Sequence, residues 1–284
     1  MTNAFDDRHG AAHLTWGAVE DIDVLGAPPR ARHDVHARGR LALQSLLLRR
    51  ESSPALVVHL HGSIERQRYE LPRFERLSSL EDLDAHVLLL ADPTLALNPN
   101  LRIGWYIGSE DDDATQHLAA LVRHIAAELG VERVIIAGSS AGGFGAMALT
   151  PHVPNSLALA FSPQVSVRRF GDEWADALRR AAFPDRSTFE SLEDDPALKP
   201  RVDLAALYGH VQGGRVWYIQ NSGDETHVEQ QRDPFAQLGD ERVTFIDEFH
   251  CAGHNPPTRT RVRAWIERAL ESPDGDPLDF ARPV

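Results

Sequence analysis

Residues 134–145 read VIIAGSSAGGFG, and this stretch decides the fold. Its apolar, partly β-branched start is typical of a buried strand, and the AMAL that follows favours a helix. Between strand and helix the chain fits the pattern G-x-S-x-G, with Ser140 at its centre. A serine on so sharp a turn has a strained backbone, and its neighbours two positions away must be small because strand and helix nearly touch. The stretch therefore predicts a tight turn that lifts the Ser140 hydroxyl clear of a sheet.

This turn would suit Ser140 to act as a nucleophile, although small residues also make ordinary strand-to-helix turns. The first free N–H groups of the new helix would point at the oxygen that becomes negative during acyl transfer. Ser139 is the local competitor, but it would have Ala137 and Ala141 at the positions where Ser140 has glycines. Ser140 is therefore the better candidate.

Composition narrows the class of protein. A chain of 284 residues with 42% hydrophobic and 25% charged residues is expected to form one soluble α/β domain over residues 1–284. The net charge of −13 argues against a nucleic-acid partner. Cys251 is the only cysteine, which excludes an intrachain disulfide. No signal peptide or membrane-spanning run is seen, so no membrane partner and a cytoplasmic location are predicted.

Apolar runs and helical spacing predict the order of the elements. We expect strands at 55–61, 85–90, 134–139, 156–161, 216–220 and 243–246, and helices at 114–129, 172–182 and 259–270. Residues 1–50 are expected to add two edge strands, within 14–25 and 40–48, and residues 164–212 a lid or helical insertion. This alternation predicts a mostly parallel central sheet with helices on both faces.

Ser140 needs a base to take its proton and a carboxylate to orient that base. Asp224 follows the strand at 216–220, and His254 follows the strand at 243–246. Both would lie at the carboxyl edge of the sheet, where open α/β sheets build their sites. The loop after Asp224 is unusually polar, so Glu225 or Asp233 could replace Asp224 as the acid.

From about residue 40 to 270 the chain resembles an α/β-hydrolase. The resemblance depends on His61-Gly62, the turn at Ser140, Gly223-Asp224 and Gly253-His254, which occur in the order serine, acid, histidine. It implies a three-layer fold in which Ser140 is the nucleophile, His254 the general base and then acid, and Asp224 its orienter. It also implies an oxyanion hole made by the amides of Ala141 and Ser63. The chain lacks the three consecutive glycines of the lipase-type loop.

Several other residues are candidates for contact with a substrate: Gly62, Ser139, Trp105, Tyr106 and His227. The two aromatic residues could equally form a substrate wall or part of the core, and His227 could line a pocket or lie exposed on its loop.

The sequence predicts no metal site and no cofactor. His59 and His61 alternate onto one strand face, but no carboxylate follows them at ligand spacing. The glycines at 138–145 match neither common phosphate-binding pattern.

The main hypothesis is a serine hydrolase that cleaves a carboxylic ester of a small molecule or glycan through an acyl-serine. The same machinery could pass the acyl group to an alcohol or sugar hydroxyl, which would make the protein an acyltransferase. A non-catalytic binding module on a hydrolase scaffold is a further alternative. The sequence leaves the substrate and the oligomeric state open.

Overall fold

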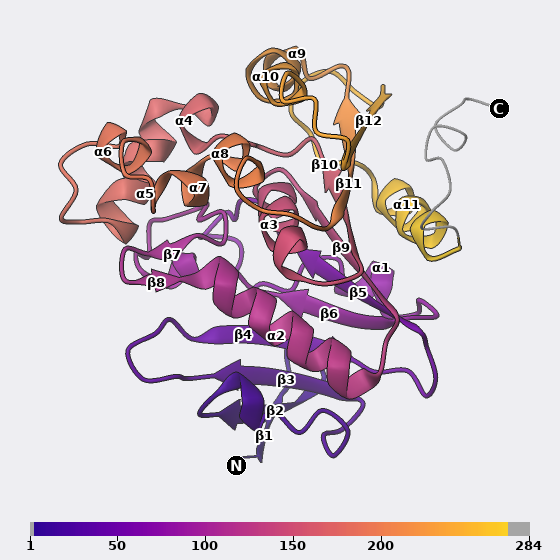
Figure 1. Ribbon diagram of the computed structural model, residues 1–284. Helices are drawn as coiled ribbons and strands as arrows, with labels where there is room; N and C mark the ends of the chain where they lie inside the picture. Colours follow the sequence, from indigo (N-terminus) through magenta and orange to yellow (C-terminus); the bar gives the residue numbers. More distant parts are fainter. Residues whose placement is uncertain (1–2, 272–284) are drawn as a thin grey trace.

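The computed structural model describes residues 3–271, and ten of the strands in this range pair in one sheet (Figure 1). Its order is β1-β2-β3-β4-β6-β5-β9-β10-β11-β12. These strands are β1 (Asn3–Asp6), β2 (Ala11–Trp16), β3 (Arg30–Val35), β4 (Leu43–Leu48), β5 (Ala55–Leu60), β6 (His86–Leu90), β9 (Arg133–Ser139), β10 (Ser156–Phe161), β11 (Arg215–Asn221) and β12 (Val243–Glu248). A separate two-stranded hairpin contains β7 (Gly108–Ser109) and β8 (Asp112–Asp113).

The strands from β6 to β12 in this order are all parallel to one another. The predicted mostly parallel sheet is therefore confirmed. After β5 the chain adds β6 on one side and later β9 on the other. The crevice beyond the carboxyl ends of β5 and β9 is thus the point where the winding changes direction, and such points are where open α/β sheets bind ligands.

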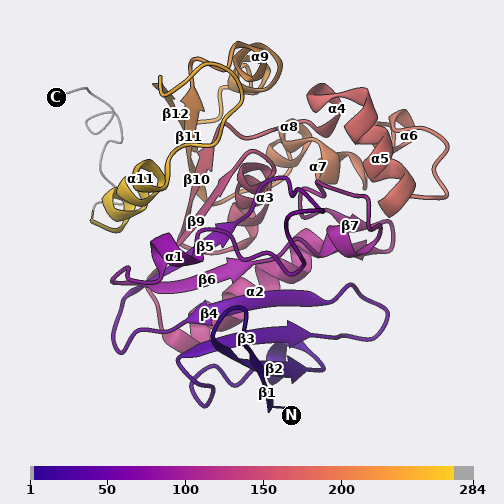
Figure 2. The ribbon, with the colours of Figure 1, turned by 180° about the vertical axis from the view of Figure 1, so that it is seen from behind.

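Helices cover both faces of this sheet. α2 and α3 lie against one face, and α1 and α11 lie on the other (Figures 1 and 2). The α-helices are α1 (Leu77–Leu80), α2 (Ala114–Leu129), α3 (Ala141–Leu149), α4 (Val167–Phe170), α5 (Asp172–Ala182), α6 (Glu190–Glu193), α7 (Lys199–Val202), α8 (Leu204–Tyr208), α9 (Glu225–His227), α10 (Asp233–Ala236) and α11 (Arg259–Glu271). Short turns of other helix types are η1 (Val19–Asp21), η2 (Pro93–Ala96), η3 (Thr150–His152) and the π-helical η4 (Val228–Arg232).

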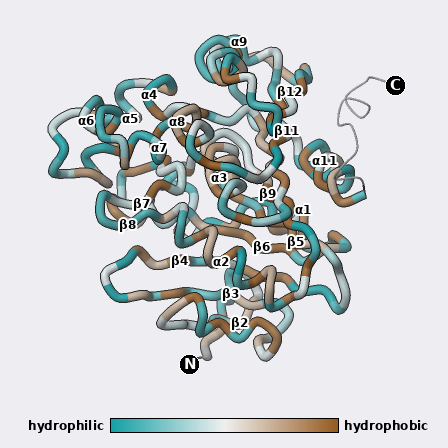
Figure 3. Tube along the Cα trace, in the orientation of Figure 1, coloured by the Kyte–Doolittle hydropathy of each residue, from teal (hydrophilic) through white to brown (hydrophobic). Residues whose placement is uncertain are grey.

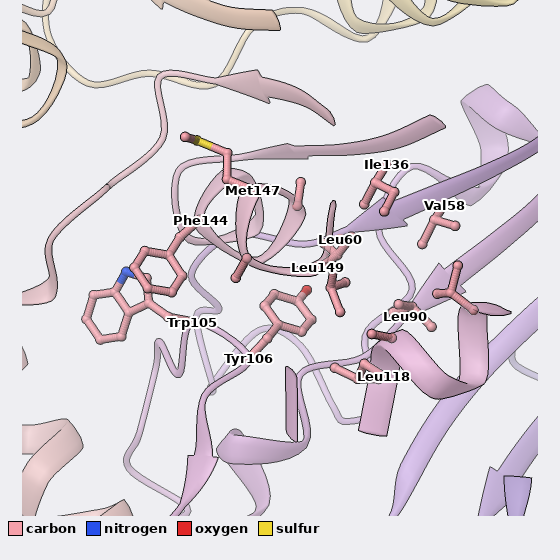
Figure 4. Close-up of a cluster of buried hydrophobic side chains, with 14 of the residues drawn as sticks. Val58, Leu60, Leu90, Trp105, Tyr106, Leu118, Ile136, Phe144, Met147 and Leu149 are labelled. Atoms are coloured by element: carbon pink, nitrogen blue, oxygen red, sulfur yellow. The ribbon is translucent and has the colours of Figure 1, made fainter. Parts of the chain in front are cut away.

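The sheet divides the core into two main clusters. On β5, Val58 and Leu60 pack with Phe144 of α3, whereas Val57 faces the cluster that contains Trp265 of α11. Figure 4 shows the first of these clusters, and Figure 3 shows hydrophobic residues concentrated along the central strands. Because both faces of β5 are buried, its sequence is a nearly continuous apolar run, which made the strand easy to predict.

The helix predicted at 114–129 is confirmed with these bounds as α2. The Asp113 carboxylate accepts a hydrogen bond from the Gln116 N–H at 3.3 Å and caps its start. Gly130 adopts a left-handed conformation, with φ 63°, and ends it.

The N-terminal prediction was wrong in part. Four strands, β1 to β4, replace the two expected edge strands, and β4 lies inside the sheet between β3 and β6. The prediction failed because β3 is polar: Arg32 lies on it and pairs with Asp6 on β1 at 3.1 Å and with Asp34. Because these charged side chains pair with one another, they can lie within the sheet. A strand of this kind has no apolar run, so hydropathy does not predict it.

Residues 164–212 form the short helices α4 to α8, grouped beyond α3 (Figure 1). They are tied to the loop at 107–113, since Arg201 Nη2 donates to the Ser109 carbonyl at 2.6 Å and the Glu110 N–H donates to the Ala182 carbonyl at 2.9 Å. Short helices are thus present between β10 and β11, and their role as an insertion or lid stays a prediction. Among the described residues, no helix combines the length and the apolar character needed to cross a membrane.

Candidate active site

Ser140 occupies the tight corner between β9 and α3. Its φ of 57° and ψ of −120° are unusual for any residue other than glycine. A Cβ on Gly138 would overlap the Gly142 carbonyl oxygen, and a Cβ on Gly142 would lie 2.5 Å from the Leu60 carbonyl oxygen. The flanking glycines are therefore required by close backbone contact, as the pattern predicted.

The structure brings Ser140, His254 and Asp224 together. His254 Nε2 lies 3.0 Å from Ser140 Oγ, and His254 Nδ1 lies 2.6 Å from Asp224 Oδ2. Since the carboxylate only accepts, His254 carries its proton on Nδ1 and its Nε2 is free to accept the Ser140 proton. Asp224 is almost fully buried, whereas the His254 side chain is 31% exposed. The arrangement can deprotonate Ser140 and hold the resulting imidazolium.

The loops that carry Asp224 and His254 are joined to each other by Asn221, the last residue of β11. Asn221 Nδ2 donates to the carbonyls of Cys251 at 2.9 Å and Gly253 at 3.1 Å. The Gly253 N–H donates in turn to the Gly223 carbonyl at 2.8 Å. These contacts fix the approach of His254 to the acid. We refer to Asn221 and the two loops as the Asn221 tether.

The alternative acids are placed elsewhere. Glu225 is exposed in the first turn after Asp224, and Asp233 pairs with Arg232 at 2.6 Å. Asp224 is the carboxylate in contact with His254, and it also caps α9 by accepting from the His227 N–H at 3.3 Å.

Gln164 is a further side chain in contact with Ser140. Its Nε2 donates to Ser140 Oγ at 2.8 Å and to His227 Nε2 at 3.0 Å. Its Oε1 accepts from Trp105 Nε1 at 3.2 Å, which fixes the orientation of the amide. Gln164 is fully buried. One amide thus holds the candidate nucleophile and a second histidine at once.

His227 is stacked on His254. The two ring centroids lie 3.8 Å apart, and the ring planes differ by 5°. His227 Nδ1 also lies 3.2 Å from Asp224 Oδ2. Burial, together with the adjacent His254, lowers the pKa of His227 to about 4. His227 is therefore a neutral ring at neutral pH, and it braces one face of His254.

Among the described residues, Asp224, His227 and His254 place three possible metal-ligand atoms within 4.8 Å of one another. The two imidazole rings are parallel, so their in-plane nitrogen lone pairs do not converge on a single point as metal ligands would. His59 and His61 do not form a metal pair either: His61 is bonded to the Gly62 carbonyl at 2.7 Å and to the Asp92 N–H at 3.1 Å.

The predicted oxyanion-hole residues lie on two segments beside Ser140. Ala141 is the first residue of α3, so its N–H has no acceptor within the helix. A Cβ on Gly62 would lie 3.8 Å from Ser140 Cβ, which places the loop after β5 against the nucleophile. Ser63 is exposed on this loop, and Ser139 is buried. The use of the Ser63 and Ala141 amides as an oxyanion hole stays a prediction.

Trp105 and Tyr106 are core residues here, not an exposed substrate wall. Both are fully buried, and Figure 4 shows them beside Phe144 in the core. The Tyr106 hydroxyl donates a hydrogen bond to the His61 carbonyl at 3.1 Å. Tyr106 therefore stabilises the end of β5 next to the site from within the core.

The aromatic side chain that does lie beside the candidate triad is Phe170 of α4. Its ring meets those of His227 and His254 edge-on, with centroids 5.9 and 6.5 Å away. Phe170, Asp224, His227 and His254 all line one cavity of about 510 Å³. His227 is buried and lines this cavity, and its contact with a substrate stays a prediction.

Sequence reasoning missed Gln164, Phe170 and Asn221. A signal existed for Gln164, which closely follows the end of β10 at the same edge of the sheet as Ser140. Polar residues at the carboxyl ends of neighbouring parallel strands are expected to meet. Phe170 gave no such signal, because an aromatic residue in a helix is usually part of the core.

Solved structures resemble this chain over most of its length. The capsule O-acetyltransferase of Neisseria meningitidis serogroup A matches with a TM-score of 0.59 and 16% identity over 88% of this chain and 97% of that one. An S-formylglutathione hydrolase from Agrobacterium tumefaciens matches at 0.54 and 15%, covering 85% and 93%. Esterase B from Lactobacillus rhamnosis matches at 0.53 and 16%, covering 84% and 83%. No protein-family model and no curated protein matches the sequence.

Proposed function

The chain has the α/β-hydrolase fold, and we propose that it cleaves carboxylic esters through an acyl-serine intermediate. The observation that carries this proposal is the pair of contacts made by His254, 3.0 Å from Ser140 Oγ and 2.6 Å from Asp224 Oδ2. A serine hydroxyl alone is a weak nucleophile, and a base oriented by a carboxylate is the arrangement that activates it.

In the first half-reaction, His254 takes the Ser140 proton while Oγ attacks the ester carbonyl carbon. The carbonyl oxygen becomes negative and is held by backbone N–H groups, which we assign to Ala141 and Ser63. His254 then gives the proton to the leaving alcohol as the C–O bond breaks. Asp224 stabilises the imidazolium throughout.

In the second half-reaction, His254 takes a proton from water, and the resulting hydroxide attacks the acyl-serine carbonyl. The bond to Ser140 Oγ breaks, Oγ regains its proton from His254, and the free acid leaves. Gln164 holds Oγ in both steps as a positioning residue.

Acyl transfer is the second candidate function. The similarity to a capsule O-acetyltransferase over 97% of that chain favours it. The chemistry differs only in the second half-reaction, where the hydroxyl of an alcohol or sugar replaces water as the acceptor.

A fluorophosphonate probe and a panel of activated esters test the proposed function. We expect the probe to label Ser140 and the wild-type protein to hydrolyse p-nitrophenyl acetate. Ser140→Ala is expected to lose about 10⁶ in turnover while remaining folded, and Asp224→Asn about 10⁴. Turnover by Ser140→Ala close to that of the wild type would refute the proposal. Analysis of products with and without a sugar acceptor separates hydrolysis from transfer.

A further inference from the structure

A cavity of about 1030 Å³ opens between the segment 66–78, the start of α11 and the hairpin of β1 and β2, and arginine is the most frequent residue in its lining. Seven arginines line it against three glutamates. This balance is opposite to that of the whole chain, whose net charge is −13. The cavity is therefore a local positive site on an acidic protein.

Most of these guanidinium groups lack an acidic partner. Arg8 pairs with Glu70 at 3.7 Å and Arg30 with Glu81 at 3.0 Å. In the described part of the chain, five others have no carboxylate in ion-pair contact: Arg66, Arg68, Arg73, Arg76 and Arg259. Glu75 is the remaining acidic residue of the lining and partly offsets the charge of Arg76 without an ion-pair contact. Unneutralised guanidinium groups that share one cavity repel each other, so a bound anion would stabilise them.

Arg73 and Arg76 have the closest contacts with neighbouring groups, while Arg66 donates to the Leu95 carbonyl at 3.4 Å. Arg73 lies over the Tyr69 ring, with its guanidinium carbon 4.1 Å from the centroid. Arg76 Nη2 donates to the Pro257 carbonyl at 3.0 Å, while its Nε is buried without a hydrogen-bond partner. These arginines are partly ordered before any ligand binds, which lowers the entropic cost of binding.

The cavity begins close to the candidate nucleophile. Arg66 is four residues after Gly62, which packs against Ser140, and Pro257 is three residues after His254. Four residues of extended chain span at most about 14 Å. One substrate could therefore place a reacting carbonyl at Ser140 and an anionic group among the arginines. Figure 2 shows α1 beside α11 on the side of the sheet opposite α2.

We propose that this cavity binds a phosphate group of the substrate, on the part that does not react. The inference depends on the proposed function and adds a substrate class, a phosphate-bearing ester or acyl acceptor. Several guanidinium groups around one space favour phosphate over a single carboxylate, because phosphate accepts bidentate hydrogen bonds from more than one arginine. The cavity is large enough for a sugar phosphate or a nucleotide.

Calorimetric titration of the full-length protein tests this site with two probes. Adenosine 3′,5′-bisphosphate represents a phosphomonoester donor, and a short glycerol phosphate oligomer represents a phosphodiester chain. We expect at least one probe to bind, and the one that binds identifies the source of the phosphate. Arg68→Gln with Arg73→Gln should weaken binding at least tenfold, and so should Arg259→Gln, an exposed position that tolerates substitution.

Arg38→Gln is the matched control, since Arg38 is an exposed arginine outside the cavity that forms no ion pair with another described residue. Binding should be unchanged in this variant, and circular dichroism checks the fold of each protein. Absence of binding of both probes to the wild type would overturn the proposal, and so would an equal loss in Arg38→Gln. Failure of the wild type to hydrolyse p-nitrophenyl acetate, a neutral ester, would instead count against the proposed function.

Discussion

Gln164→Leu tests how far the Ser140 hydroxyl depends on its neighbouring amide. Leucine has nearly the same volume but neither donates nor accepts a hydrogen bond. The substitution removes the donors that lie 2.8 Å from Ser140 Oγ and 3.0 Å from His227 Nε2. It also leaves the Trp105 indole N–H without its acceptor in a fully buried position.

Two magnitudes follow from these contacts. A neutral hydrogen bond contributes about 0.5–1.5 kcal/mol, so kcat is expected to fall about two- to tenfold, with KM little changed. The unpaired Trp105 N–H should lower the free energy of unfolding by about 1–3 kcal/mol. Removal of a donor to the oxyanion would cost about 10²–10³ in kcat, a much larger effect. The predicted loss is smaller because Gln164 contacts Oγ itself.

Hydrolysis of p-nitrophenyl acetate measures the first quantity and urea denaturation the second. Gln220→Leu is the matched control, since Gln220 is a fully buried glutamine whose amide donates to the Asn221 carbonyl and, within residues 3–271, makes no hydrogen bond to Ser140. A folded Gln164→Leu protein with unchanged kcat would refute the positioning role. A loss beyond about 10³ would also refute it, because it would assign Gln164 to the oxyanion.

His227→Phe keeps a ring stacked on His254 but removes the nitrogen that accepts the hydrogen bond from Gln164. The kcat for p-nitrophenyl acetate should therefore fall about threefold to tenfold. An unchanged kcat would show that only the stacking matters. Burial lowers the pKa of His59 to about 4, below its unfolded value of about 6.5, so proton uptake by this one residue in the unfolded chain should lower the stability of the wild type by about 2 kcal/mol between pH 8 and pH 5, in addition to what other buried histidines such as His33 contribute. His59→Leu should lack this share of the loss in urea denaturation at the two pH values, and an identical pH dependence would contradict the assignment. Gly142→Ala should lower the free energy of unfolding by about 3 kcal/mol, because the new Cβ would meet the Leu60 carbonyl; a midpoint equal to that of the wild type would contradict the predicted clash.

The parallel half of the sheet could be predicted because its strands are buried on both faces. A strand such as β5 is apolar at almost every position, and turn residues end it. The N-terminal strands could not be predicted in the same way. Their charged residues are stabilised by partners such as Arg32 and Asp6, which lie 26 positions apart in the chain.

The candidate site shows the same division. Ser140, Asp224 and His254 each follow a predicted strand, and the order of strands in a parallel sheet brings such positions to one edge. The stacking of His227 and the contact of Gln164 depend on side-chain directions at distances of 3–4 Å. Spacing along a sequence does not determine such directions, so these roles emerge only from the three-dimensional arrangement.

The Asn221 tether has a consequence for how this site could be lost or altered. The Asn221 amide and the Gly253 N–H together join the acid loop to the histidine loop, so Asp224 and His254 form a preassembled pair. Loss of the Asn221 amide would remove two of the hydrogen bonds that hold the His254 loop while both hydrophobic clusters remain packed. Inactivation by heat or mild denaturant can then precede global unfolding. Conversely, substitutions around Ser140 could change which substrates bind without altering the contact between Asp224 and His254.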